Sequence, residues 1–171
     1  MGLLSSKDIE YQQYTLGDIG VIELLIVYRY KYDDNIFLDD SIPMAVSGAA
    51  RVNEEVIYTY ASLDQTIARC NFNEQQKEMI RLIGEGYSQS EIAFELGLHQ
   101  STISGRLQTI YKKIYKENEW LWRKCVYEDK LELKNKICSK CKEEMPATPE
   151  FYSDLHKSKD GFHSQCRKCK Y

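Results

Sequence analysis

The chain has 171 residues, of which 43% are hydrophobic, and it carries 23 Lys or Arg against 26 Asp or Glu, a net charge of −3. This size and composition suffice for one ordinary hydrophobic core and a small additional module. The sequence lacks the run of about twenty apolar residues that a membrane span requires, and its N-terminus lacks the pattern of a signal peptide. We therefore expect a cytoplasmic protein without a membrane partner.

Residues 1–70 are acidic, and we expect them to be helical. Residues 18–32 are broadly apolar; their length favours a buried helix, although their β-branched and aromatic composition would also suit two short strands. Ser41-Ile42-Pro43 is a favourable helix start, because proline is tolerated in the first turn. Ser62 with Gln65 three residues later predicts the start of another short helix. No catalytic motif appears here, so this region is expected to cover the helices that follow and to present an acidic surface to a protein partner.

Residues 71–118 carry the signals of three short helices. Ser88, followed three residues later by Glu91, is a capping box. Gly97 is placed to end the second helix, because glycine adopts the left-handed C-cap conformation at low cost. The third helix, from about Gln100 to Lys116, has small polar residues in its first turn. This arrangement is typical of a helix-turn-helix that enters the DNA major groove; the alternative is a three-helix module that packs on a partner protein.

A series of short motifs runs through this segment: Phe72-Asn73-Glu74, Ile80-Arg81-Leu82, Gly86-Tyr87-Ser88, Glu91-Ile92-Ala93, Leu96-Gly97-Leu98, Ser101-Thr102-Ile103 and Arg106-Leu107. In these residues the chain resembles the fourth-region helix-turn-helix of sigma-70-type factors and of the related LuxR-type response regulators. The resemblance covers about a quarter of the chain and implies DNA binding, but does not decide which kind of regulator this is. His99 departs from the pattern, since the family usually places Ser there as the cap of the recognition helix. The order of an acidic front, this motif and a short tail also resembles phage and prophage regulators of the sigma-like type.

The predicted recognition helix suggests which side chains would contact DNA. Base-edge contacts are expected from Gln100, Ser101 and Ser104, with His99 as a further candidate. Glutamine can form two hydrogen bonds with an adenine edge, whereas serine accepts several bases. Phosphate contacts are expected from Thr102, Arg106, Lys112 and Lys113.

The charge distribution supports this prediction. Residues 1–99 hold 7 Lys or Arg and 16 Asp or Glu, a net charge of −9, whereas residues 100–171 hold 16 and 10, a net charge of +6. Phosphate neutralisation supplies most of non-specific DNA affinity. The alternative is an uneven distribution of solvated charges without a function.

Residues 119–136 are expected to form a helical linker. Trp120, Trp122 and Tyr127 would either anchor this linker by packing or stack on nucleic acid, and packing is the favoured role. Cys70 and Cys125 belong to no motif and are predicted to be small core residues.

Residues 137–171 contain two C-x2-C pairs, Cys138 with Cys141 and Cys166 with Cys169, separated by about two dozen residues. Two such pairs complete the tetrahedral four-thiolate set that structural zinc prefers. Two disulfides are the alternative, disfavoured in a cytosolic protein. We therefore expect one structural Zn²⁺, with no open coordination position for a catalytic water.

Asp160-Gly161, between the two pairs, is a strong hairpin signal. The tail resembles the small zinc-ribbon or treble-clef modules of bacteriophage-type proteins, some of which sit beside HNH nucleases. That nuclease chemistry needs further metal-binding His, Asn or Asp residues, and the tail offers only His156 and His163. We expect no enzymatic activity.

Taken as a whole, the sequence predicts a mainly α-helical, sequence-specific regulator of transcription that binds double-stranded DNA and carries a small β-rich zinc module. Two alternatives stay open. One is a sigma-like or antitermination factor whose main contact is RNA polymerase. The other is a phage DNA-packaging subunit of the small-terminase type, which would form rings.

Overall fold

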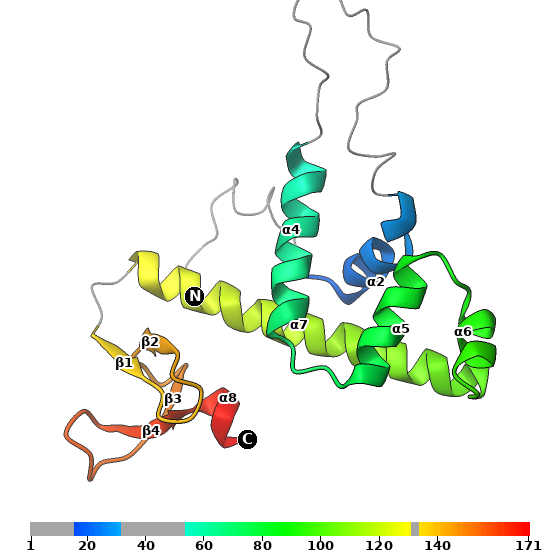
Figure 1. The fold of residues 1–171 in the computed structure, drawn as a ribbon. Helices are drawn as coiled ribbons and strands as arrows, with labels where there is room; N and C mark the ends of the chain where they lie inside the picture. The colour runs from blue at the N-terminus through cyan, green and yellow to red at the C-terminus, as the bar shows by residue number, and fades with distance from the viewer. Residues whose placement is uncertain (1–15, 32–53, 131–133) are drawn as a thin grey trace, which may run out of the picture. The chain divides into compact units, whose positions relative to one another are not determined.

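The computed structural model describes residues 16–31, 54–130 and 134–171 and divides the chain into two compact units, residues 1–118 and 119–171 (Figure 1). The protein is mainly helical with a small C-terminal β region, as predicted. Its described elements are α2 (Ile19–Val27), the 3-10 helix η1 (Arg29–Lys31), α4 (Glu54–Arg69), α5 (Glu74–Gly84), α6 (Gln89–Glu95), α7 (Gln100–Lys130), β1 (Asn135–Ile137), β2 (Glu144–Pro146), β3 (Tyr152–Asp154), β4 (Phe162–Cys166) and α8 (Arg167–Lys170).

Helix α2 confirms the helical interpretation of the apolar N-terminal segment. Asp18 caps it, because Oδ1 accepts hydrogen bonds from the backbone N–H groups of Gly20 (2.6 Å) and Val21 (3.2 Å). Just after α2, both terminal nitrogens of Arg29 donate to the carboxylate of Asp64 on α4, at 2.6 and 2.7 Å. A paired contact of this kind fixes geometry as well as contributing energy, so it links η1 to α4.

Helix α4 is unbroken, and the predicted helix start at Ser62 is wrong. The Ser62 carbonyl accepts a hydrogen bond from the Thr66 hydroxyl at 2.8 Å, as in a helix interior. Leu63 is fully buried and Thr66 nearly so. Packing of these two residues outweighs the local preference of a serine for a cap position. The predicted helix start at Ser41-Ile42-Pro43 lies outside the described residues.

Helices α5 and α6 each begin with a reciprocal capping box. The predicted box is confirmed: Ser88 N donates to Glu91 Oε2 at 2.8 Å, and Glu91 N donates to Ser88 Oγ at 3.3 Å. Asn73 and Gln76 form the same arrangement at the start of α5, which was not predicted. These side chains satisfy N–H groups that have no partner inside the helix, so they set where both helices begin.

Gly97 ends α6 as predicted, with a φ of 62° in the left-handed region. After it, α7 begins at Gln100 and continues to Lys130, well beyond the predicted end near Lys116. No glycine or proline follows Gly105 within this helix, so the local sequence contains no helix-breaking residue there.

One apolar core holds the described helices of residues 1–118 together. Figure 1 shows α2, α4, α5 and α6 gathered around the first part of α7, and buried side chains from all five meet in this core. The contribution of α7 comes from one side of the helix: Ile103, Leu107, Ile110, Tyr111 and Ile114 are buried. Glu117 is also buried, and its Oε1 lies 3.3 Å from Arg69 Nε of α4. This packing fixes which side of α7 faces outward.

The second unit has a small core of its own. Phe151 is fully buried, and the rings of Trp120 and Tyr127 meet it edge to face, with centroids 5.1 and 5.7 Å away. This confirms the packing role predicted for Trp120, whereas Trp122 remains 48% exposed. Of the two cysteines predicted to be core residues, Cys70 is buried, but Cys125 is exposed because it lies on a side of α7 that nothing described covers.

Two antiparallel pairs, β1 with β2 and β3 with β4, form the β region. The predicted hairpin around Asp160 joins β3 to β4, although its connection is longer than a two-residue turn and closes with Leu155 N donating to the Gly161 carbonyl at 2.7 Å. Lys136 of β1 donates to Asp160. This contact, with hydrogen bonds from Phe162 N and Ser158, lowers the pKa of the Asp160 carboxyl to about 2.

Replacement of Gly97 by alanine should destabilise the protein by about 1 kcal/mol, because alanine adopts a positive φ only at a steric cost. The same change at Gly105, inside α7, should stabilise it by about 0.5–1 kcal/mol, since alanine is the better helix former. No heavy atom lies within 4 Å of the added Cβ at either position, so backbone conformation alone separates the two. Urea unfolding followed by far-UV circular dichroism measures both. Equal effects would contradict the role of Gly97 as a helix terminator.

Candidate functional site

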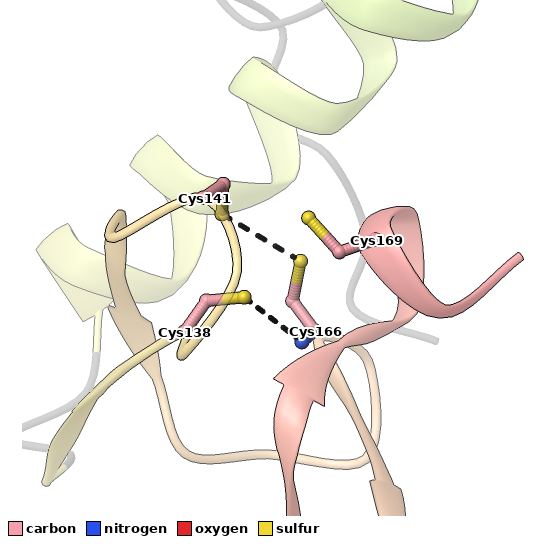
Figure 2. Close-up of side chains that lie close together, drawn as sticks. All are labelled: Cys138, Cys141, Cys166 and Cys169. Atoms are coloured by element: carbon pink, nitrogen blue, oxygen red, sulfur yellow. Dashed lines mark hydrogen bonds between the residues drawn. The ribbon is translucent and has the colours of Figure 1, made fainter.

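Four cysteine side chains come together in the second unit. The sulfur atoms of Cys138, Cys141, Cys166 and Cys169 all lie within 4.8 Å of one another, and Figure 2 shows them gathered between the β1–β2 turn and α8. Cys138 directly follows β1, Cys141 lies in the turn, Cys166 ends β4, and Cys169 belongs to α8. The structure thus brings together all four residues that the spacing predicted.

Backbone geometry in the two turns places these sulfurs. In the first turn, Lys142 N donates to the Cys138 carbonyl at 3.0 Å, and Lys142 itself has a φ of 62°. In the second, Arg167 N donates to the Phe151 carbonyl at 2.7 Å. The turns also meet directly, since Lys140 Nζ donates to the Cys169 carbonyl at 3.0 Å. Each tight turn therefore points two cysteines toward the same centre.

The electrostatics of the cluster favour a bound cation. Burial disfavours ionisation of the Cys138 thiol, but backbone N–H groups of Cys166, Cys141 and Lys140 donate to its sulfur and lower its pKa to about 6. Burial raises the pKa of Cys166 and of Cys141, and the negative charges of neighbouring thiolates add to both increases. Cys138 therefore ionises readily, whereas ionisation of Cys141 and Cys166 is disfavoured. A divalent cation at the centre would remove this penalty.

The donor set is consistent with zinc. Four thiolates at about 2.3 Å from a tetrahedral Zn²⁺ lie roughly 3.8 Å apart, and Cys141 Sγ and Cys166 Sγ are 4.0 Å apart. That separation is about twice the length of an S–S bond, and all six cysteines are free thiols. The four cysteines could hold one metal ion, with every tetrahedral position filled by protein.

A second candidate site is the side of α7 turned away from the core. Its exposed residues, here called the outward face of α7, are Ser101, Gly105, Gln108, Thr109, Lys112 and Lys116. Side chains on this face are polar or cationic. Among the described residues, Lys112 and Lys116 pair with no carboxylate, whereas Lys77 and Arg81 on α5 both do. The outward face therefore carries uncompensated positive charge.

The residues predicted to contact DNA divide into two groups. Ser101 and Lys112 lie on the outward face, Gln100 is exposed at the first position of the helix, and His99 is exposed just before it. The others, which are Thr102, Ser104, Arg106 and Lys113, are half-buried along its flanks. Arg106 donates to Gln75 of α5, and Lys113 donates to the Asn71 carbonyl with its ammonium 4.7 Å from the Phe72 ring centroid. These last two cations therefore also help to hold α7 in place.

Three residues of the outward face were not predicted: Gln108, Thr109 and Lys116. The helical spacing from Gly105 and Lys112 would have identified them, because positions three and four apart share a face. Thr109 Oγ1 donates to the Gly105 carbonyl at 3.0 Å, and Gln108 Nε2 donates weakly to Glu23 of α2 at 3.4 Å. Both side chains thus have partners within the protein while remaining exposed.

Each helix within the described parts of the chain is too short or too polar to cross a bilayer. Comparison of the sequence and the structure with protein-family models, curated proteins and solved structures gives no match.

The purified chain should contain one metal ion, and Cys166→Ser should abolish tight binding, because three thiolates and a hydroxyl no longer complete the set. Cys125→Ser is the matched control, since Cys125 is exposed and outside the cluster. Metal content can be measured by mass spectrometry, and substitution with Co²⁺ reports tetrahedral thiolate coordination by visible absorption. Loss of metal in both variants, or in neither, would contradict the assignment.

Proposed function

We propose that the protein is a sequence-specific regulator of transcription that binds double-stranded DNA through α6, the Gly97 turn and α7, acting as a helix-turn-helix. The observation that carries this proposal is the outward face of α7, which combines polar side chains near its start with two lysines further along that pair with no described carboxylate. A helix of about 10–12 Å diameter fits the major groove, which is roughly 12 Å wide.

Recognition of the DNA base sequence is assigned to the first turns of α7. Gln100 and Ser101 are exposed there, and Gln can bond an adenine edge in bidentate fashion. Gly105 follows one turn later on the same face, with no heavy atom within 4 Å of the position a Cβ would take. A missing side chain at this point supports a close approach of the helix backbone to DNA. His99 and Ser104, which flank this face, are further candidate base contacts.

Phosphate binding is assigned first to Lys112 and Lys116, whose ammonium groups have no competing carboxylate among the described residues. Thr102, Arg106 and Lys113 lie on the flank of α7 and are proposed as additional contacts, since a guanidinium that donates to one glutamine retains further N–H donors. Such contacts fix the position of the helix without selecting sequence.

The four-cysteine cluster is proposed to hold a structural Zn²⁺. Zinc would supply folding energy to the second unit, whose apolar core is small, and four protein ligands leave no position for a catalytic water. The proposal therefore includes no enzymatic activity. A cytoplasmic location fits a site of this kind, because reducing conditions keep thiols available for the metal.

One observation favours the alternative in which RNA polymerase is the main partner. Phe94 on α6 is 87% exposed, and an exposed aromatic of this size is a frequent anchor of protein interfaces. A DNA-packaging subunit is the other alternative and would assemble into rings. Co-purification with polymerase that depends on Phe94, or a large homo-oligomer on size exclusion, would favour these over a regulator that acts through DNA alone.

Selection of binding sites from a random duplex library tests sequence reading. The zinc-loaded wild-type chain should enrich one motif, and Gln100→Ala should lose preference at a single base pair, with a cost of about 1–3 kcal/mol or 5- to 150-fold on the selected site. If Gln100→Ala lowered the affinity for selected and random DNA equally, the assignment of Gln100 as a base contact would be wrong. Salt-sensitive binding without any enrichment would exclude sequence-specific recognition.

Lys112→Gln should weaken binding to all duplexes alike and lower the slope of log affinity against log salt concentration by about one. The matched control is Lys77→Gln, because Lys77 is an exposed lysine on α5 that pairs with Glu74 at 2.7 Å. Fluorescence anisotropy in a salt series measures both. If the two variants change the slope equally, net charge rather than the outward face of α7 governs binding.

A further inference from the structure

The turns that hold the two cysteine pairs also carry a group of cations, here called the knuckle cations: Lys140, Lys142, Arg167, Lys168 and Lys170. The first two belong to the β1–β2 turn, and the other three belong to α8. These segments are distant in sequence, but the cysteine sulfurs within 4.8 Å and the hydrogen bond from Lys140 to the Cys169 carbonyl place the turns side by side (Figure 2). The fold therefore brings these five cations together at one end of the second unit, with Glu143 as the carboxylate residue of the same two segments.

Four of these cations, unlike Lys136 and Arg123 of the same unit, have no carboxylate partner among the described side chains. Lys136 pairs with Asp160, and Arg123 lies between Glu119 and Glu150. By contrast, no carboxylate whose side chain the structure describes forms an ion pair with Lys140, Lys142, Arg167 or Lys170. Positive charge that folding leaves unpaired on an exposed surface is available to an anionic partner.

A metal ion bound by the four cysteines would leave a negative charge that balances part of this positive charge, because four thiolates around a divalent cation have a net charge of −2. Lys140 also has a structural role, since it bridges the two turns. Arg167 uses its Nε to donate to the Pro149 carbonyl at 2.7 Å, and the rest of its guanidinium fork keeps further N–H donors. Lys142, Arg167 and Lys170 are all exposed. The positive charge of these three side chains is therefore more than a metal-bound cluster needs for charge balance.

We propose that the knuckle cations form a second nucleic-acid-binding surface, which contacts the phosphates of duplex DNA. Guanidinium and ammonium groups together are the donors that phosphate oxygens accept best. Tyr171 is 90% exposed, with Lys170 Nζ 5.5 Å from its ring centroid. A tyrosine hydroxyl beside ammonium and guanidinium groups adds a further phosphate donor, and a DNA duplex presents closely spaced phosphates to such a surface.

This surface shares no residue with the outward face of α7, so the two proposals can be tested independently of each other. Two DNA contacts on one chain raise affinity without any gain in sequence preference, provided that both can engage together. The expected contribution of the knuckle cations is thus a non-specific, salt-sensitive one.

The test compares two triple variants of the full-length, zinc-loaded chain. Lys142→Gln, Arg167→Gln and Lys170→Gln remove knuckle cations, whereas Lys134→Gln, Lys157→Gln and Lys159→Gln remove the same charge from exposed positions elsewhere in the same unit. Affinity for a 25-base-pair duplex of random sequence is measured by fluorescence anisotropy over a salt series. The knuckle variant should lower the slope by about 2 to 3 and weaken binding at least tenfold, while the control changes affinity less than threefold.

Equal losses in the two triple variants, or no loss in either, would overturn the proposal. Zinc content is measured in both triple variants. If the knuckle triple variant loses metal, the DNA affinities of the single variants Lys142→Gln and Lys170→Gln test the proposal instead, since neither residue lies between paired cysteines. Loss of binding to vesicles of anionic lipid with unchanged DNA affinity would assign the surface to membranes instead. Lys112→Gln in the same assay separates the two proposals, because its effect should add to that of the knuckle variant.

Discussion

Burial of one side of α7 is the constraint on which the organisation of the first unit depends. Ile103, Leu107, Ile110, Tyr111 and Ile114 recur at helical spacing and are all buried against α2, α4, α5 and α6. Truncating a buried Ile or Leu to Ala typically costs about 2–5 kcal/mol, so a rotation of α7 that exposed several of them would cost more than a small protein's stability allows. The same burial makes the opposite side the outward face, and this is why Ser101, Gly105 and Lys112 share a surface.

The second unit is organised by a different force. Its apolar core contains few side chains, chiefly Phe151, Tyr152 and Met145, and its paired strands are three to five residues long. Small β modules rarely hold together through such a core alone. Four converging thiols would provide the missing crosslink on binding a metal ion, whose charge would offset the opposition of burial and neighbouring thiolates to ionisation of Cys141 and Cys166. In the proposed zinc-bound protein, metal coordination would then play in the second unit the role that apolar packing plays in the first.

The positively charged side chains divide into those that have carboxylate partners and those that do not. Where cations hold elements together they have defined partners, as Arg29 has in Asp64 and Lys136 has in Asp160. Lys112 and Lys116 of the outward face, and Lys142 and Lys170 beside the cysteine pairs, have no carboxylate partner among the described side chains. No described ion pair of the fold involves these four charges, and both proposals of nucleic-acid binding follow from that distinction.

The sequence by itself determined the features that depend on neighbouring residues: the Ser88–Glu91 capping box, the end of α6 at Gly97, and the two tight C-x2-C turns. Each is local, because the hydrogen bond or backbone angle involved spans at most a few residues. Only the tertiary structure decided that α4 continues through Ser62, since burial of Leu63 and Thr66 outweighs a local cap signal. It also decided that Arg106 and Lys113 contact other parts of the first unit whereas Gln108, Thr109 and Lys116 face outward, because side-chain direction depends on what packs beneath the helix. Finally, it decided that two cysteine pairs distant in sequence meet at one centre, which spacing can predict but only folding can bring about.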